Sequence, residues 1–122
     1  MNLNLHHIAG YFDAKGSVGI YFHGSGEYWY MRVQIMKKKD PSSKKYFIKL
    51  QRQFGGTLSI VTLPVGIFYS WQLTSKKAES FLGFILPYLK IKTDQVKKAV
   101  EWNKNKRYSL RYSNMLKRMK RI

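Results

Sequence analysis

The sequence contains no cysteine, only three prolines and only six acidic residues among its 122. Without cysteine the chain has no disulfide framework, no thiolate zinc site and no cysteine nucleophile. No apolar run reaches the 18 residues of a membrane-spanning helix, and the first residues lack the basic-then-apolar pattern of a signal peptide. We therefore expect a soluble, intracellular protein in a reducing compartment, with no membrane partner.

Basic residues, in contrast, are abundant. The 23 lysines and arginines give a formal net charge of +17, and 12 of them lie between Lys90 and Ile122. Such a charge opposes compaction by self-repulsion, so we expect it to serve a polyanion, with nucleic acid the first candidate. The 44% of apolar residues suit one domain over 1–122, with a basic carboxyl-terminal segment at about 104–122. That segment lacks the wide apolar face of a membrane-surface helix.

Local patterns predict an α+β domain with the order α-β-β-α-β-β-α-α. Apolar residues at helical spacing alternate with stretches of period two, and glycine and proline clusters separate them. The predicted strands are 17–23, 28–36, 57–62 and 67–74, and the predicted helices are 3–14, from a cap at 40–42 to 54, 76–88 with Ser75 as its cap, 93–105, and most of the basic segment.

Four strands in two hairpins form an antiparallel sheet, and helices are expected to cover its apolar face. The opposite face carries hydrogen-bonding and aromatic side chains but no acid, whereas an ordinary solvated face mixes acids with bases. This composition suits base edges in a DNA groove. The predicted DNA-reading residues are Ser17, Tyr21, His23, Tyr28, Tyr30, Arg32, Gln34, Thr57, Ser59, Ser70 and Gln72, and the predicted phosphate contacts are Arg107, Arg111, Lys117 and Arg118.

A nine-residue motif connects the first helix to the first strand. Residues 8–16 read IAGYFDAKG, which resembles the LAGLIDADG signature of the homing endonucleases. The resemblance extends to the element order, to the turn Phe54-Gly55-Gly56 and to PYLKIKTDQV at 87–96, which is similar to the late PYL-x-x-K-x-x-Q segment of that family. It covers nearly the whole chain, and it implies the LAGLIDADG endonuclease fold in its single-motif form.

In that family two motif helices pack against each other. A chain with one motif is therefore expected to form a homodimer that reads a pseudo-palindromic site in double-stranded DNA. Gly10 would permit close backbone approach, and Ala9 and Ala14 would keep the contact thin. The residues expected at the dimer interface are Ile8, Ala9, Gly10, Phe12 and Asp13.

The resemblance implies Mg²⁺-dependent hydrolysis of phosphodiesters, with a metal-binding acid at the next-to-last motif position. That position is Lys15 here, and an ammonium group cannot ligate a divalent cation. We therefore expect no bound metal and impaired cleavage. Asp13 is the nearby carboxylate, but it points about 200° away around the helix axis, at about 100° per residue. Its position is structural in the family.

Three further residues match polar positions of the family's cleavage site. Lys92 matches the late basic residue, Gln95 the nearby glutamine, and Lys37 the polar residue at the end of the second strand. Together with Lys15 they are the candidate catalytic set. Three functions remain open: an intron-encoded endonuclease with unusual catalysis, a cleavage-defective sequence-specific DNA-binding protein, which we favour, and an RNA-binding maturase.

Overall fold

The computed structural model describes residues 3–120, and its elements follow the predicted order. The α+β class is confirmed, and nearly all helix and strand ends lie within a few residues of the predicted ones. The helices are α1 (Leu5–Lys15), α2 (Pro41–Phe54), α3 (Ser75–Ile85), α4 (Thr93–Asn105) and α5 (Ser109–Met119), with a 3₁₀ turn η1 (Leu86–Tyr88), and the strands are β1 (Gly16–His23), β2 (Tyr28–Lys38), β3 (Thr57–Leu63) and β4 (Gly66–Thr74).

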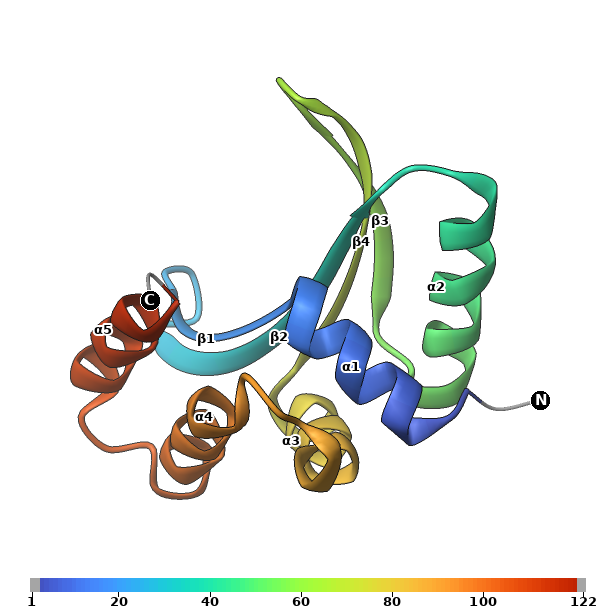
Figure 1. Cartoon of the computed structure of the whole chain (residues 1–122). Helices are drawn as coiled ribbons and strands as arrows, with labels where there is room; N and C mark the ends of the chain where they lie inside the picture. The colour runs from blue at the N-terminus through green and yellow to red at the C-terminus, as the bar shows by residue number, and fades with distance from the viewer. Residues whose placement is uncertain (1–2, 121–122) are drawn as a thin grey trace.

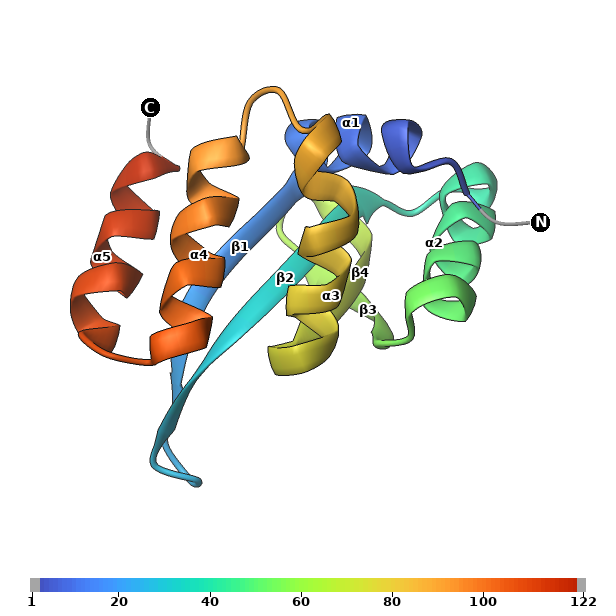
Figure 2. The same ribbon diagram turned by 90° about the horizontal axis from the view of Figure 1, so that it is seen from below.

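The four strands form one antiparallel sheet in the order β1-β2-β4-β3. Gly16 pairs with Ile35 at one end of the first hairpin and His23 with Tyr28 at the other, while Gln34 joins the hairpins by pairing with Gln72. The sheet bends strongly, and the helices lie on its convex side (Figure 1). Helices α3, α4 and α5 cover that side next to one another (Figure 2). The concave face is therefore left without a helix.

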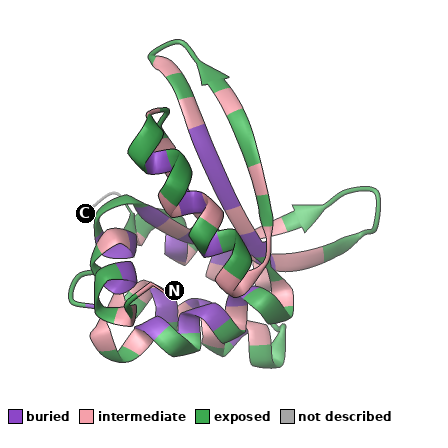
Figure 3. Ribbon diagram, turned by 90° about the vertical axis from the view of Figure 1, so that its right-hand side faces the viewer, coloured by how far each residue is buried: buried purple, intermediate pink, exposed green. Residues whose placement is uncertain are grey.

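The core lies between the convex face of the sheet and the helices. Its largest fully buried side chains include Trp71 from the sheet, Phe12 from α1, Phe47 from α2, Phe81 from α3 and Trp102 from α4. Figure 3 shows buried residues gathered where helices meet the sheet and exposed residues at the hairpin ends. Because strand side chains alternate between faces, the core takes every second residue and leaves the others to the concave face.

Helix α2 has sequence-encoded signals at both ends. The Asp40 carboxylate accepts hydrogen bonds from the Ser43 N–H (2.7 Å) and the Ser42 hydroxyl (2.8 Å), and these bonds lower the pKa of Asp40 to about 2. At the other end Gly55 and Gly56 have φ of 81° and 94°, in the region that side chains rarely adopt. The predicted cap and glycine turn are thus both present.

Two details of the following elements differ from the prediction. Ser75 is the first residue of α3, with φ of 52°, and Thr74 takes the cap position without a side-chain hydrogen bond, so Ser75 is not a cap. The helix ends at Ile85 rather than continuing to Tyr88, because Pro87 lies in a short 3₁₀ turn where its missing N–H is tolerated. Within residues 3–120 no helix has the length and apolar character needed to cross a membrane.

Candidate nucleic-acid interface

The concave face collects the predicted polar residues from all four strands. The strand register sets these residues directly opposite one another, so that they point to the same side of the sheet. The pairs are Ser17 with Gln34, Tyr21 with Tyr30, His23 with Tyr28, Gln34 with Gln72, Arg32 with Thr74, Thr57 with Gln72, and Ser59 with Ser70. The predicted reading face is thus one continuous surface.

One member of this set is not accessible. Ser70 is fully buried, and its hydroxyl accepts a hydrogen bond of 2.9 Å from Nε2 of Gln34. The Ser70 side chain is therefore not exposed on this face. Its position on the central strand β4, between β2 and β3, encloses it among neighbouring side chains. Ser70 instead accepts the hydrogen bond that orients the Gln34 side chain.

Arg32 lies over an aromatic ring. Its guanidinium carbon lies 4.0 Å from the centroid of Tyr21, the distance of a cation–π contact. The Tyr21 ring in turn lies over Gly19, where a β-carbon would come within 2.6 Å of the Tyr21 hydroxyl. Because Gly19 pairs with Arg32 across the strands, its missing side chain makes room for the stacked pair. The arginine is therefore presented in a defined orientation.

The tip of the β1–β2 hairpin carries a second aromatic group. The rings of His23 and Tyr28 stack with centroids 5.0 Å apart and planes 3° apart. The Gly26 N–H donates to Nδ1 of His23 at 2.9 Å, so a neutral imidazole carries its proton on Nε2. Tyr30 packs edge-on against Tyr28 at 6.2 Å. The tip thus offers hydrogen-bond donors on a rigid aromatic base.

The end of α1 is tied to the start of α4. Both carboxylate oxygens of Asp13 accept backbone N–H groups: Lys90 at 2.8 Å, Ile91 at 3.2 Å and Lys92 at 2.9 Å. The Lys92 ammonium donates in return to the carbonyls of Phe12, at 3.2 Å, and Gly16. Burial lowers the pKa of Lys92, and the charge of Asp13 opposes that shift. We name these contacts of Asp13 and Lys92 the clasp.

The candidate catalytic residues differ in their exposure and in the contacts of their side chains. Lys15 is exposed at the last position of α1, directly before Gly16. The Lys92 ammonium donates hydrogen bonds to backbone carbonyls of its own chain, so it is not free to bind a phosphate. Gln95 is half-buried on α4, and its side-chain oxygen is buried without a hydrogen-bond partner among residues 3–120. Lys37 lies two residues beyond Ile35, the partner of Gly16, on the helix-covered face of β2.

A further lysine near the clasp, Lys120, was not predicted as a site residue. The charge of Lys120, the residue that follows α5, contributes to lowering the pKa of Lys92, so Lys120 lies near the clasp. Its distance in sequence from the motif concealed this proximity. The only signal at the sequence level was the density of basic residues in the tail.

The exposed side of α1 differs from the predicted dimer interface. Ile8, Ala9 and Phe12 are fully buried in the protein's own core, and Asp13 is occupied by the clasp. Of the five predicted residues only Gly10 is exposed, and a β-carbon built there meets nothing within 4 Å. One helical turn away on either side, His7 and Ala14 complete the exposed face. The motif's apolar positions and Ala9 thus face inward, while Gly10 and Ala14 face outward.

The basic tail is not part of the concave face. Arg111, Lys117 and Arg118 are exposed on α5, and Arg107 lies in the loop before it. The Ser113 hydroxyl donates to the carbonyl of Ile20 at 2.8 Å, which seats α5 against the outer strand β1 on the helix side of the sheet. The structure therefore separates the predicted phosphate contacts from the predicted base-reading residues.

The donor set at the end of α1 does not fit a divalent cation. Lys15 offers an ammonium group, and both oxygens of Asp13 are engaged by backbone N–H groups. Among residues 3–120 no three His, Asp or Glu side chains lie close enough together to hold a metal ion. A magnesium site therefore has no carboxylate ligand here.

Solved structures of homing endonucleases are similar to this chain. The homing endonuclease I-CvuI, crystallised with a DNA target in the presence of Mg, matches with a TM-score of 0.72 and 15% identity over 94% of this chain and 80% of that one. In a second complex of I-CvuI the match covers 65% of that chain. The homing endonuclease I-TnaI matches with a TM-score of 0.68 and 17% identity, over 99% of this chain and 96% of that one.

A third neighbour is a longer protein, and the match covers less than half of it. The LAGLIDADG homing endonuclease I-SmaMI, bound to cleaved DNA, matches with a TM-score of 0.65 and 20% identity over 91% of this chain. The match spans only 41% of I-SmaMI itself. No family model and no curated protein matches the sequence significantly. The chain has the fold of the LAGLIDADG homing endonucleases.

Proposed function

We propose that the chain is a sequence-specific binder of double-stranded DNA on a homing-endonuclease scaffold, with cleavage impaired at Lys15. The observation that carries the proposal is the acid-free concave face, on which Arg32 stacks on Tyr21 beside Gln34 and the aromatic hairpin tip. A guanidinium in fixed orientation can donate two hydrogen bonds to O6 and N7 of guanine, and a glutamine can pair similarly with adenine. The net charge of +17 adds attraction to the phosphates.

A pseudo-palindromic site requires two copies of this face. The exposed His7, Gly10 and Ala14 side of α1 lets a second copy approach closely, because Gly10 adds no side chain between the helices. Two copies related by a two-fold axis would extend the concave surface along the duplex. The dimer is therefore part of the proposal.

Lys15 determines the proposed loss of cleavage. Two Lys15 ammonium groups, one from each copy, would stand where the scaffold's metal ligands are expected, and they attract phosphate rather than a cation. At the carboxyl end of α1 a lysine is also favoured by the helix dipole, whereas an acid there is not. The chain can thus hold DNA without a metal.

Base reading is tested with a random duplex library and the Arg32→Ala variant. We expect this variant to lose about 1 to 3 kcal/mol on the best selected site and to relax the base preference there. Arg52 is an exposed arginine on α2, and Arg52→Ala removes the same charge. This control should change neither the affinity for the best site nor the base preference. Equal weakening of every sequence by Arg32→Ala would show that the concave face does not read bases. Tighter binding to an RNA library than to duplex DNA would favour the maturase alternative.

Cleavage is tested with the selected duplex and either Mg²⁺ or Mn²⁺. The chain as it stands should bind without cutting. Lys15→Glu should gain metal-dependent cutting of both strands and lose metal-free affinity, because an anion then faces phosphate. Lys97→Glu, an exposed position on α4 with the same charge change, is the control and should not cut. Robust cleavage by the unchanged sequence would contradict the proposed role of Lys15.

A further inference from the structure

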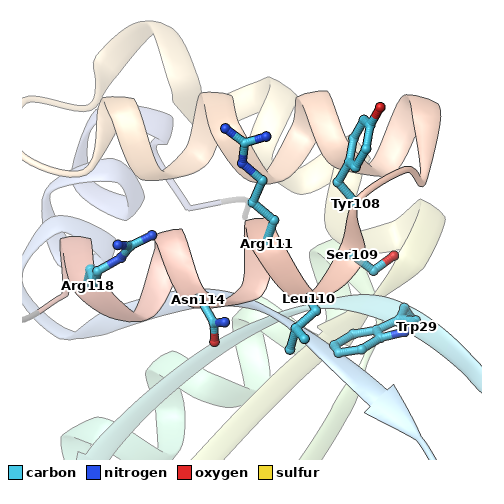
Figure 4. A pocket seen from close by; sticks show the side chains of 7 residues that line it. All are labelled: Trp29, Tyr108, Ser109, Leu110, Arg111, Asn114 and Arg118. Atoms are coloured by element: carbon cyan, nitrogen blue, oxygen red, sulfur yellow. The ribbon is translucent and has the colours of Figure 1, made fainter.

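A groove of about 670 Å³ lies between α5 and the β1–β2 hairpin, on the helix side of the sheet (Figure 4). Trp29 lines it from the hairpin, and Tyr108, Leu110, Arg111 and Arg118 line it from the α5 side. Trp29 alternates with Tyr28 and Tyr30 along β2, so it points away from the concave face. The groove is therefore a surface separate from the proposed duplex site.

The groove offers flat apolar groups that the core does not use. Tyr108 is 71% exposed and Leu110 is 62% exposed. Trp29 packs on Phe22 with ring centroids 5.4 Å apart, which holds the indole in place. The other wall is anchored too, because Nε1 of Trp102 donates to the Ser109 hydroxyl at 3.0 Å. The aromatic surfaces are thus presented on supported elements.

The charge of the groove has one sign. Arg111 and Arg118 line it, and no aspartate or glutamate does. Figure 4 shows both arginines on α5, with Arg111 and Tyr108, the residue before α5, on one side of the helix and Leu110 on the side of Trp29. Arg107 and Lys117 add positive charge on the neighbouring exposed surface. A partner must therefore supply anionic groups together with flat or apolar ones.

We propose that this groove binds single-stranded nucleic acid, with bases stacked on Trp29 and Tyr108 and phosphates held by Arg111 and Arg118. Unpaired strands expose base faces for stacking, whereas a duplex keeps them inside the helix. Stacking platforms beside cationic side chains are the usual chemistry of single-strand binding. The inference goes beyond the proposed function, since the two nucleic acids would occupy opposite sides of the sheet.

Trp29 itself supplies the readout. Trp71 and Trp102 are buried, so Trp29 is the tryptophan in contact with the groove. A single strand of about 8 nucleotides, tested as RNA and as DNA, should quench its fluorescence by stacking. An abasic strand of the same length carries the same charge and should not quench. Trp29→Phe should remove the signal while binding measured by anisotropy persists. Equal quenching by the abasic strand, or none by any strand, would overturn the proposal.

Substitutions on α5 test the phosphate-binding arginines without touching the core. Arg111→Gln combined with Arg118→Gln should weaken single-strand binding and reduce its salt slope by about 0.7 for each phosphate that is no longer neutralised. Lys49→Gln combined with Arg52→Gln removes the same charge from exposed positions on α2 and serves as the control. An equal loss of affinity in both double variants would mean that only total charge matters, and the groove would then not be a site.

The two surfaces are separated by crossing the variants with the two probes. The α5 double variant should lose single-strand affinity and keep its base preference on duplex DNA, and Arg32→Ala should do the reverse. Parallel losses would place the groove within the duplex site and overturn the inference. Absence of any duplex preference with persistent Trp29 quenching would overturn the proposed function alone. Quenching by RNA and DNA both supports the groove, and the ratio of their affinities identifies the preferred sugar.

Discussion

Asp13 is the residue whose local chemistry connects the motif to the rest of the molecule. Its carboxylate accepts three successive backbone N–H groups at 90–92, and Lys92 closes the clasp from the other side. Those N–H groups precede the first turn of α4 and would otherwise need another acceptor. The position of Lys15 therefore depends on Asp13, although the two side chains point in different directions.

Asp13→Asn should destabilise the fold by about 2 to 4 kcal/mol. The amide keeps one acceptor oxygen but turns an N–H₂ group toward a backbone donor, and hydrogen bonds to a charged acceptor are the stronger kind. Asp94→Asn, exposed on α4, is the matched control and should change stability little. Urea denaturation measures both. Equal stability of Asp13→Asn and the unchanged protein would show that the clasp contributes little.

At the scale of elements, α1 and α2 meet through a pair of tyrosines. The rings of Tyr11 and Tyr46 stack with centroids 4.6 Å apart and planes 22° apart. Both hydroxyl groups are buried without a hydrogen-bond partner in the described part of the chain. Desolvation raises the pKa of Tyr46 far above its ordinary value of 10.0 and raises that of Tyr11 as well. This contact requires neutral phenols.

The pH dependence of stability follows from these raised pKa values. A raised folded-state pKa means that Tyr46 supports the fold fully below the unfolded value of 10.0, and that this support is lost as the pH rises beyond it. Tyr46→Phe should be neutral or slightly stabilising at pH 7, by up to about 1 kcal/mol, because it removes an unpaired hydroxyl. At about pH 11 the gain in stability of Tyr46→Phe over the unchanged protein should be larger. If Tyr46→Phe changed the free energy of unfolding equally at both pH values, the raised pKa of Tyr46 would be contradicted.

For the whole molecule, the decisive question is how two copies meet. The exposed side of α1 is narrow and carries a glycine at its centre, while the concave sheet face opens beside it (Figure 1). A close α1–α1 contact would set the two concave faces side by side, as a two-fold DNA site needs. A bulky side chain at Gly10 would hold the helices apart.

Gly10→Leu should therefore separate the dimer while leaving each copy folded. A β-carbon at Gly10 meets nothing within the protein, and leucine is favoured over glycine in a helix by about 0.8 kcal/mol. Gly83→Leu is a matched control, because Gly83 is also exposed on a helix with free space around it. Sedimentation of both variants, free and on a two-fold duplex, measures the effect. A dimer that survives Gly10→Leu would show that the copies meet elsewhere.

The sequence by itself determined the elements and the faces of the sheet. Alternation over Tyr28–Met36 separates the concave face from the core, because strand geometry has a period of two that tertiary contacts do not change. The Asp40 cap and the Gly55-Gly56 turn are likewise local: each is set by hydrogen bonds or dihedral angles within a few residues. The resemblance of residues 8–16 to a known motif supplied the remaining expectations about function.

Only the tertiary structure decided which side chains are free to act. Asp13 meets its partners 77 to 79 residues along the chain, Lys92 bonds to carbonyls of α1, and Ser113 seats α5 on β1 across 93 residues. Such pairs leave no periodic trace, because they depend on how elements pack rather than on local spacing. The same packing buried Ile8 and Phe12, exposed Gly10, and placed Arg111 and Arg118 on the helix side, where they line the same groove as Trp29.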